Sequence, residues 1–161
     1  MKTLQSILVL AVAFAFGSVS CADEEKNPLH KVPANVKEAV ENYFPDAQFI
    51  SAEQETENGK VLYEIVIRYM GKKFEVLVSA DGVIEAVETE IDLRDLAKSI
   101  TDYLAKNYLN AKIGNAEKVV DSKGRTTYEV VVHVGGKKYE FTFDANGNFV
   151  AVEEIEAKKK E

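Results

Sequence analysis

Residues 63–78 read YEIVIRYMGKKFEVLV, and the alternation of apolar and polar side chains in this stretch decides the fold. On both sides of Gly71 every second residue is β-branched or aromatic, which are the residue types that strands favour. A period of two residues places these side chains on one face of each strand and the polar ones on the other. The stretch therefore predicts two antiparallel strands that are joined by a tight turn and buried on one face.

The same pattern occurs a second time in residues 128–143, which read YEVVVHVGGKKYEFTF. The correspondence extends outward: Ala52-Glu53 matches Ala116-Glu117, 64 residues further on, and Ala80-Asp81-Gly82 matches Ala145-Asn146-Gly147 at a spacing of 65. Less regular strands are expected in residues 48–55, 83–88, 112–120 and 148–153. Matches at a nearly constant spacing predict a tandem duplication.

A helix is expected before each set of strands. In the first, Pro33 suits the first helical turn, Pro45 ends the helix, and Val36, Val40 and Tyr43 share one face. In the second, Asp92 is expected to cap the N-terminus. The apolar positions of that helix are Leu93, Leu96, Ala97, Ile100, Tyr103 and Leu104.

The predicted fold class is α+β, with two tandem units of one helix and four antiparallel strands. The units span residues 29–90 and 91–155, and residues 156–161 are expected to form a flexible tail. A unit of roughly 60 residues buries only ~60% of its unfolded surface and is marginally stable alone. We therefore expect one broad sheet with both helices on one face.

The first 22 residues have the pattern of a secretory signal peptide. Lys2 supplies a positive start, residues 7–16 form an apolar run, and small residues follow. The run is shorter than the ~20 residues that span a bilayer, so no transmembrane anchor is expected in the mature chain. Cleavage after Ala22 predicts a periplasmic or secreted protein. The alternative is a lipoprotein modified at Cys21, although Ser18 stands where such sites usually have Leu.

Composition argues against several function classes. The formal net charge of −7 disfavours binding to nucleic acid or to an anionic membrane surface. One Cys and two His leave little material for a disulfide framework or a zinc site. Residues 144–148 contain Asp and Asn but lack a complete calcium-binding loop, and a hairpin turn explains them better. We therefore expect no metal, no cofactor and no catalytic site.

The remaining candidate is the strand face that points away from the helices. It could be a solvated surface with cross-strand charge pairs, or it could bind a protein partner in the cell envelope or outside the cell. A sheet of this width offers the ~800 Å² per partner of a standard interface, which favours binding. The candidate partner-binding residues are Glu64, Val66, Arg68, Lys73, Glu75, Leu77, Glu129, Val131, His133, Lys138, Glu140 and Thr142.

The sequence also resembles the PepSY-like domain family, which is described as β-lactamase-inhibitor-like. The residues that carry the resemblance are those of 32–40, 43–47, 63–65, 71–75 and 80–82. The second unit departs from the pattern, because Leu109-Asn110 replaces Pro45-Asp46 and no Pro opens its helix. The resemblance implies exported bacterial proteins without known catalysis and a broad sheet similar to that of the β-lactamase inhibitor protein, which grips an enzyme with its concave face.

The predicted function is thus an exported, non-catalytic protein-binding module, with inhibition of an envelope or secreted enzyme such as a peptidase as one form of it. One alternative is a small enzyme with a pocket between helix and sheet, which requires a buried, unpaired carboxylate or Tyr there. The other is a structural or stress-associated envelope protein without a dedicated partner.

Overall fold

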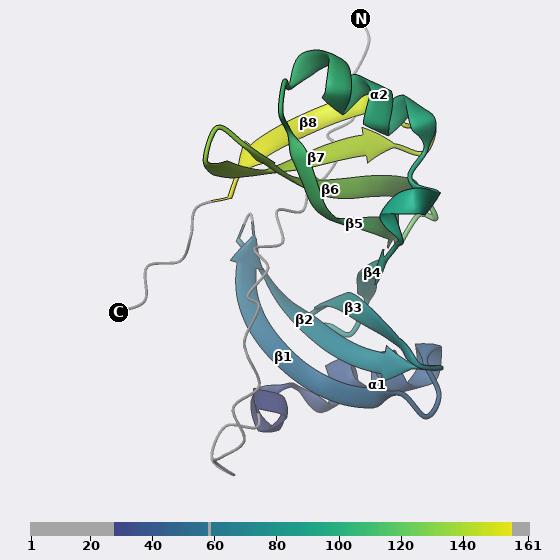
Figure 1. The fold of residues 1–161 in the computed structure, drawn as a ribbon. Helices are drawn as coiled ribbons and strands as arrows, with labels where there is room; N and C mark the ends of the chain where they lie inside the picture. The colour runs from purple at the N-terminus through teal and green to yellow at the C-terminus, as the bar shows by residue number, and fades with distance from the viewer. Residues whose placement is uncertain (1–27, 58, 156–161) are drawn as a thin grey trace, which may run out of the picture.

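The computed structural model describes residues 28–57 and 59–155. The predicted signal peptide, the alternative lipidation site at Cys21 and the tail of residues 156–161 lie outside these residues. Within them, the same order of elements occurs twice, a 3₁₀ helix followed by an α-helix and four strands (Figure 1).

The first half contains η1 (Pro28–Lys31), α1 (Ala34–Tyr43), β1 (Gln48–Glu57), β2 (Lys60–Tyr69), β3 (Lys72–Ser79) and β4 (Ile84–Glu90). The second half contains η2 (Leu93–Asp95), α2 (Lys98–Asn107), β5 (Lys112–Asp121), β6 (Thr126–Val134), β7 (Lys137–Asp144) and β8 (Phe149–Glu154). The α+β class is therefore confirmed, and sheet dominates it.

All eight strands form a single antiparallel sheet in the order in which they occur along the chain. The two halves join where β4 pairs with β5, from Ala86 opposite Asp121 to Glu90 opposite Glu117. Because β4 ends at Glu90 and η2 begins at Leu93, the connection is too short for the two halves to move as independent domains. The predicted broad sheet is the observed arrangement.

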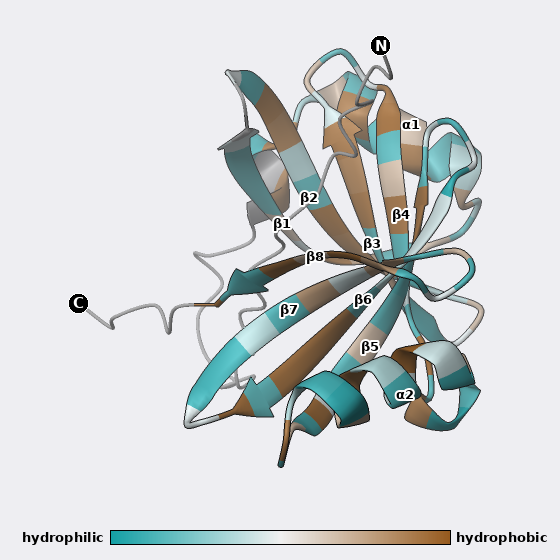
Figure 2. Ribbon diagram, turned by 90° about the horizontal axis from the view of Figure 1, so that it is seen from above, coloured by the Kyte–Doolittle hydropathy of each residue, from teal (hydrophilic) through white to brown (hydrophobic). Residues whose placement is uncertain are grey.

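Each helix packs on the sheet through a small apolar face. Val36 and Val40 of α1 contact a buried cluster that includes Ile65 and Val76. Ile100 and Leu104 of α2 do the same on a cluster with Val130, Val132, Phe141 and Phe143. The prediction that Ile65, Val76, Val130 and Phe141 are buried is confirmed, because each is 0% exposed. The sheet curves so that both helices lie on its outer side (Figures 1 and 2).

The second helix begins later than predicted. Asp92 caps the short helix η2 by accepting a hydrogen bond from the Arg94 backbone N–H, and α2 starts only at Lys98. Leu96 and Ala97 between them have extended backbone, which lets Leu96 turn into the core. The apolar spacing is compatible with one helix, but tertiary packing of Leu96 interrupts it.

The end of the first helix also differs from prediction. Tyr43 was expected on the buried face but is 61% exposed, and Phe44 is buried instead. Phe44 follows the last helical residue, and its ring lies 5.4 Å from that of Tyr69 and 5.2 Å from that of Phe74. Pro33 likewise precedes α1 with extended backbone, so it stands at the cap position outside the first turn.

The turn that follows each α-helix contains one residue in the left-handed backbone region. Asp46 has φ of 65° and Asn110 has φ of 64°, and Asp and Asn tolerate this region better than most residues. The sequence departure at Leu109-Asn110 therefore leaves the backbone turn unchanged.

Candidate partner-binding face

The helix-free face is the side of the sheet opposite α1 and α2. Strand register places all twelve predicted residues on it, since they alternate with the residues that pack under the helices. Arg68 lies opposite Lys73 where β2 and β3 meet, and His133 lies opposite Lys138 where β6 and β7 meet. The basic residues therefore gather at the hairpin ends of the face, whereas its centre is acidic.

The expectation of an outward-looking, solvated face is wrong for half of these residues. Glu75, Leu77, Glu129, Val131, Glu140 and Thr142 are buried. Glu64, Val66 and Lys138 are partly buried, and only Arg68, Lys73 and His133 are exposed. One reason is an apolar cluster on the helix-free face itself, formed by Leu62, Leu77, Ala86 and Val119.

On this face β4 carries Glu90, opposite Glu117, and each of the six inner strands, β4 included, carries one glutamate nearer the centre. We call these residues, Glu64, Glu75, Glu88, Glu117, Glu129 and Glu140, the glutamate belt. Glu75 lies directly opposite Glu88, and Glu117 lies opposite Glu129. The edge strands extend the pattern, because Glu53 lies opposite Glu64 and Glu153 lies opposite Glu140.

Four members of the belt were predicted from the sequence, whereas Glu88 and Glu117 were not. These two residues lie on β4 and β5, the strands with the weakest alternation. A usable signal was present, however. The alignment of the two units matches Glu53 with Glu117 and Glu88 with Glu153, so the same acidic positions recur in both.

The belt carboxyls differ in their partners. Lys73 Nζ lies 2.5 Å from Glu75 Oε1 and donates a hydrogen bond to it. In contrast, Glu88 Oε2, Glu117 Oε2 and Glu129 Oε2 are buried and have no hydrogen-bond partner among the described residues. A buried polar group without a partner costs roughly 1–3 kcal/mol, and more when it is charged. The carboxyl oxygens at the centre of the belt therefore lack hydrogen bonds from the described residues.

Burial raises the pKa of Glu88, Glu117 and Glu129, and repulsion between neighbouring glutamates adds to the effect. The pKa of Glu88 rises to about 10, with Glu129, Glu117 and Glu75 as acidic neighbours. The pKa rises to about 9 at Glu129 and to about 8 at Glu117 for the same reasons. These carboxyls therefore hold their protons at neutral pH, when they are uncharged.

Burial also raises the pKa of Glu64 and Glu140, which lie farther from the junction of the halves. The pKa of Glu64 rises to about 8 through burial and its contact with Glu75. At Glu140 burial raises the pKa to about 7, and the nearby Lys138 opposes the shift. The strongest perturbation thus lies at the junction of the two halves.

The interface between helices and sheet offers no comparable chemistry. Its described residues form two hydrophobic clusters, with aromatic rings in both, and the buried carboxyls lie on the opposite side of the sheet. His133 is exposed. Across residues 28–57 and 59–155, no group of three or more His, Cys, Asp or Glu is arranged to hold a metal ion. The alternative of an enzyme with a helix–sheet pocket gains no support from this packing.

The Asp144 turn is a hairpin turn, as expected. Asp144 Oδ1 accepts hydrogen bonds from the backbone N–H groups of Asn146 and Asn148, at 2.8 and 2.9 Å. Its other oxygen accepts one from the Asn148 side chain. Both carboxylate oxygens of Asp144 therefore already accept hydrogen bonds from within the turn.

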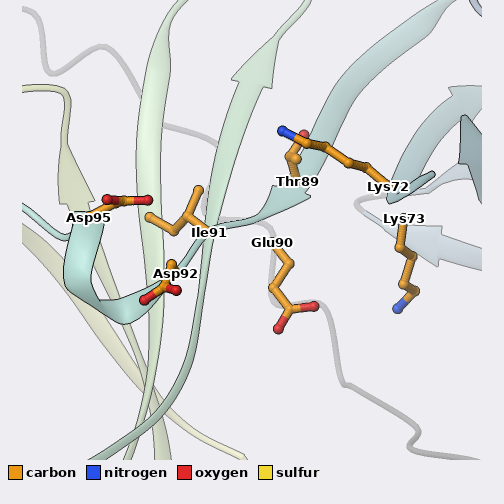
Figure 3. Close-up of a pocket in the computed structure, with 7 residues that line it drawn as sticks. All are labelled: Lys72, Lys73, Thr89, Glu90, Ile91, Asp92 and Asp95. Atoms are coloured by element: carbon orange, nitrogen blue, oxygen red, sulfur yellow. The ribbon is translucent and has the colours of Figure 1, made fainter. Parts of the chain in front are cut away.

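A polar cavity of about 540 Å³ lies beside the connection between β4 and η2 (Figure 3). Its lining comprises Lys72, Lys73, Thr89, Glu90, Ile91, Asp92 and Asp95. Glu90 connects this cavity with the belt, because it lies opposite Glu117 in the sheet.

Among the described residues no helix is long and apolar enough to cross a bilayer.

The fold resembles those of several solved bacterial proteins. A candidate periplasmic protein from Bacteroides eggerthii aligns with a TM-score of 0.62 and 15% identity, over 77% of this chain and 89% of that one. A DUF2874 family protein from Bacteroides uniformis aligns with a TM-score of 0.62 and 16% identity, over 76% and 89%. A BLIP-like protein from Bacteroides fragilis aligns with a TM-score of 0.57 and 17% identity, over 80% and 91%.

At these identities the similarity establishes a BLIP-like fold and nothing further. No family model matches the chain, and no curated protein matches it. The PepSY-like assignment therefore stays a resemblance.

Proposed function

We propose that the chain is an exported, non-catalytic protein-binding module that receives its partner on the helix-free face. The observation that carries this proposal is the set of three buried carboxyl oxygens, on Glu88, Glu117 and Glu129, that have no partner among the described residues. Buried polar groups in native proteins are nearly always hydrogen-bonded, so an unsatisfied group calls for an explanation. A partner that supplies the missing hydrogen bonds provides one.

The surroundings of the belt suit a protein partner. Val66 is the partly exposed apolar residue on this face, whereas Leu62, Leu77 and Val119 are buried beneath the carboxyls and hold them in place. Exposed Arg68 and His133 lie at the hairpin ends of the face. Charged residues at the rim of an interface contribute to the choice of partner. The edge residues Glu53 and Glu153 are exposed as well.

Export is supported by the pattern of the first 22 residues and by the periplasmic description of the protein from Bacteroides eggerthii. The BLIP-like description of the protein from Bacteroides fragilis supports inhibition of an enzyme as one form of binding. Membership of the PepSY-like family belongs to the same proposal.

The test is capture of partners from a native envelope extract with charge-reversed variants. Arg68→Glu and Lys138→Glu alter the helix-free face, whereas Lys118→Glu is a matched control on the opposite side of β5. We expect each face variant to reduce capture by about tenfold, which corresponds to 1.4 kcal/mol, and the control to capture like wild type. Equal capture by all four proteins would assign binding to another surface, and no capture at all would favour a structural role.

A further inference from the structure

We propose that the partner places a basic side chain, above all an arginine, at the centre of the glutamate belt, where it pairs with Glu88, Glu117 and Glu129. This inference rests on the proposed function and names the chemistry of the partner. The three glutamates lie on the neighbouring strands β4, β5 and β6 at the junction of the halves.

Register brings these three side chains together. Glu117 lies directly opposite Glu129, and Glu88 lies opposite Val119, two residues along β5 from Glu117 on the same face. The residues are 2%, 5% and 5% exposed, and each has an Oε2 atom without a hydrogen-bond partner. Three acceptors on one side of a sheet thus lack donors.

The chain itself shows how a cation fits this face. Lys73 reaches from the end of β3 to Glu75, and Glu75 has no unpartnered buried oxygen, in contrast to its neighbours. The basic residues Arg68, Lys73, His133 and Lys138 lie toward the hairpin ends. Lys73 acts on Glu117 through its charge, but no described residue donates a hydrogen bond to the Oε2 atoms of the central three carboxyls. An external cation would satisfy them in the way that Lys73 satisfies Glu75.

A guanidinium group fits better than a metal ion. No three acidic groups of the described residues converge closely enough to hold a metal. Arginine carries five N–H donors in a planar fork and bridges separate carboxylates that a single ion cannot reach. Charge-assisted hydrogen bonds of this kind are also stronger than neutral ones.

The cavity beside β4 lies next to the centre of the belt. Exposed Glu90 lines the cavity of Figure 3 and lies opposite Glu117, so the cavity adjoins the belt along the same strand pair. The cavity lining carries three acidic residues, Glu90, Asp92 and Asp95, and two basic ones, Lys72 and Lys73, and Asp92 is already paired with Arg94.

Protonation gives the proposal a distinctive signature. Glu88, Glu117 and Glu129 hold protons at neutral pH, and a bound cation favours their ionised form. Binding therefore releases protons, and each proton released makes the affinity rise about tenfold per pH unit below the pKa of the free protein. A surface contact with already ionised carboxylates would show neither effect.

The test uses the full exported chain and a blocked peptide, Gly-Arg-Gly-Arg-Gly-Arg-Gly, with a citrulline version as control. Citrulline keeps the shape of arginine and removes its charge. Titration calorimetry in two buffers of different ionisation enthalpy measures affinity and proton release between pH 6 and pH 8. We expect the arginine peptide to bind at least tenfold more tightly than the citrulline peptide, with about one proton released per carboxyl engaged.

Two double variants locate the site. Glu117→Gln with Glu129→Gln keeps the shape of the protonated side chains and should lose at least tenfold in affinity for the arginine peptide. Glu38→Gln with Glu41→Gln changes exposed residues of α1, on the other side of the sheet, and should bind like wild type. The inference is overturned if arginine and citrulline peptides bind alike, if the first double variant binds like wild type, or if Ca²⁺ alone displaces the peptide at millimolar concentration.

The two proposals can fail separately. If Arg68→Glu and Lys138→Glu reduce partner capture but no arginine-specific binding is found, the face binds a partner of other chemistry and only this inference falls. If the face variants leave capture unchanged, the proposed function falls, whatever the peptide does.

Discussion

Replacing Glu88 with glutamine should stabilise the protein, and the gain should grow with pH. Glu88 is 2% exposed, and burial together with four neighbouring glutamates raises its pKa from 4.5 to about 10. The folded state therefore keeps a proton that the unfolded chain releases above pH 4.5. Wild-type stability from this group is full below pH 4.5 and declines as the pH rises toward 10.

The size of the effect follows from the pKa. Each pH unit above 4.5 costs the wild type about 1.4 kcal/mol at this position, which amounts to about 3 kcal/mol at pH 7. Glutamine resembles the protonated side chain and does not ionise in either state. Glu88→Gln should therefore match wild type near pH 4.5 and exceed its free energy of unfolding by about 3 kcal/mol at pH 7.

Urea unfolding measured by far-ultraviolet circular dichroism between pH 4.5 and pH 8 tests this expectation, since the chain has no Trp. The matched control is Glu38→Gln, which changes an exposed glutamate on α1, on the other side of the sheet from the belt. Its stability should follow the wild-type pH dependence. If Glu88→Gln also runs parallel to wild type, Glu88 is ionised or solvated in the folded state, and the account of the belt is wrong.

Two further substitutions probe the packing. Lys73→Met should lower the free energy of unfolding in urea by roughly 1–2 kcal/mol, because the buried Glu75 loses its 2.5 Å contact with Lys73 Nζ. Lys72→Met, at the exposed neighbouring position, should have little effect. Equal effects of the two substitutions would show that the ion pair contributes nothing to stability. Gly147→Ala should lower the thermal midpoint more than Gly124→Ala. Both glycines have positive φ, but a Cβ at 147 would lie 2.1 Å from Ser99 Oγ and 3.2 Å from Ile100, while a Cβ at 124 meets nothing within 4 Å. Equal midpoints would mean that α2 can move away from this turn at no cost.

Local residue patterns predicted much of the fold. The alternation around Gly71 and Gly136 predicted the central hairpins, and Ile65, Val76, Val130 and Phe141 are buried as expected. The helix boundaries were less accurate. The spacing of Leu93, Leu96 and Ile100 fits a single helix, and only the burial of Leu96 shows why the chain extends between η2 and α2.

The candidate face was predicted in part. Period-two alternation alone assigns Glu75, Glu129 and Glu140 to one face, but it cannot show that they are buried. Glu88 and Glu117 were missed because their strands alternate weakly and because nothing in the local sequence states that β4 pairs with β5.

The sequence by itself thus determined which side chains share a face, because that property depends only on the two-residue period of a strand. The tertiary structure decided how the two halves join. Pairing of β4 with β5 makes one continuous sheet, and its curvature and the Leu62–Leu77–Ala86–Val119 cluster withdraw the neighbouring glutamates from water. Burial and mutual repulsion arise only from that long-range arrangement, so the unusual chemistry of the belt is a property of the folded protein.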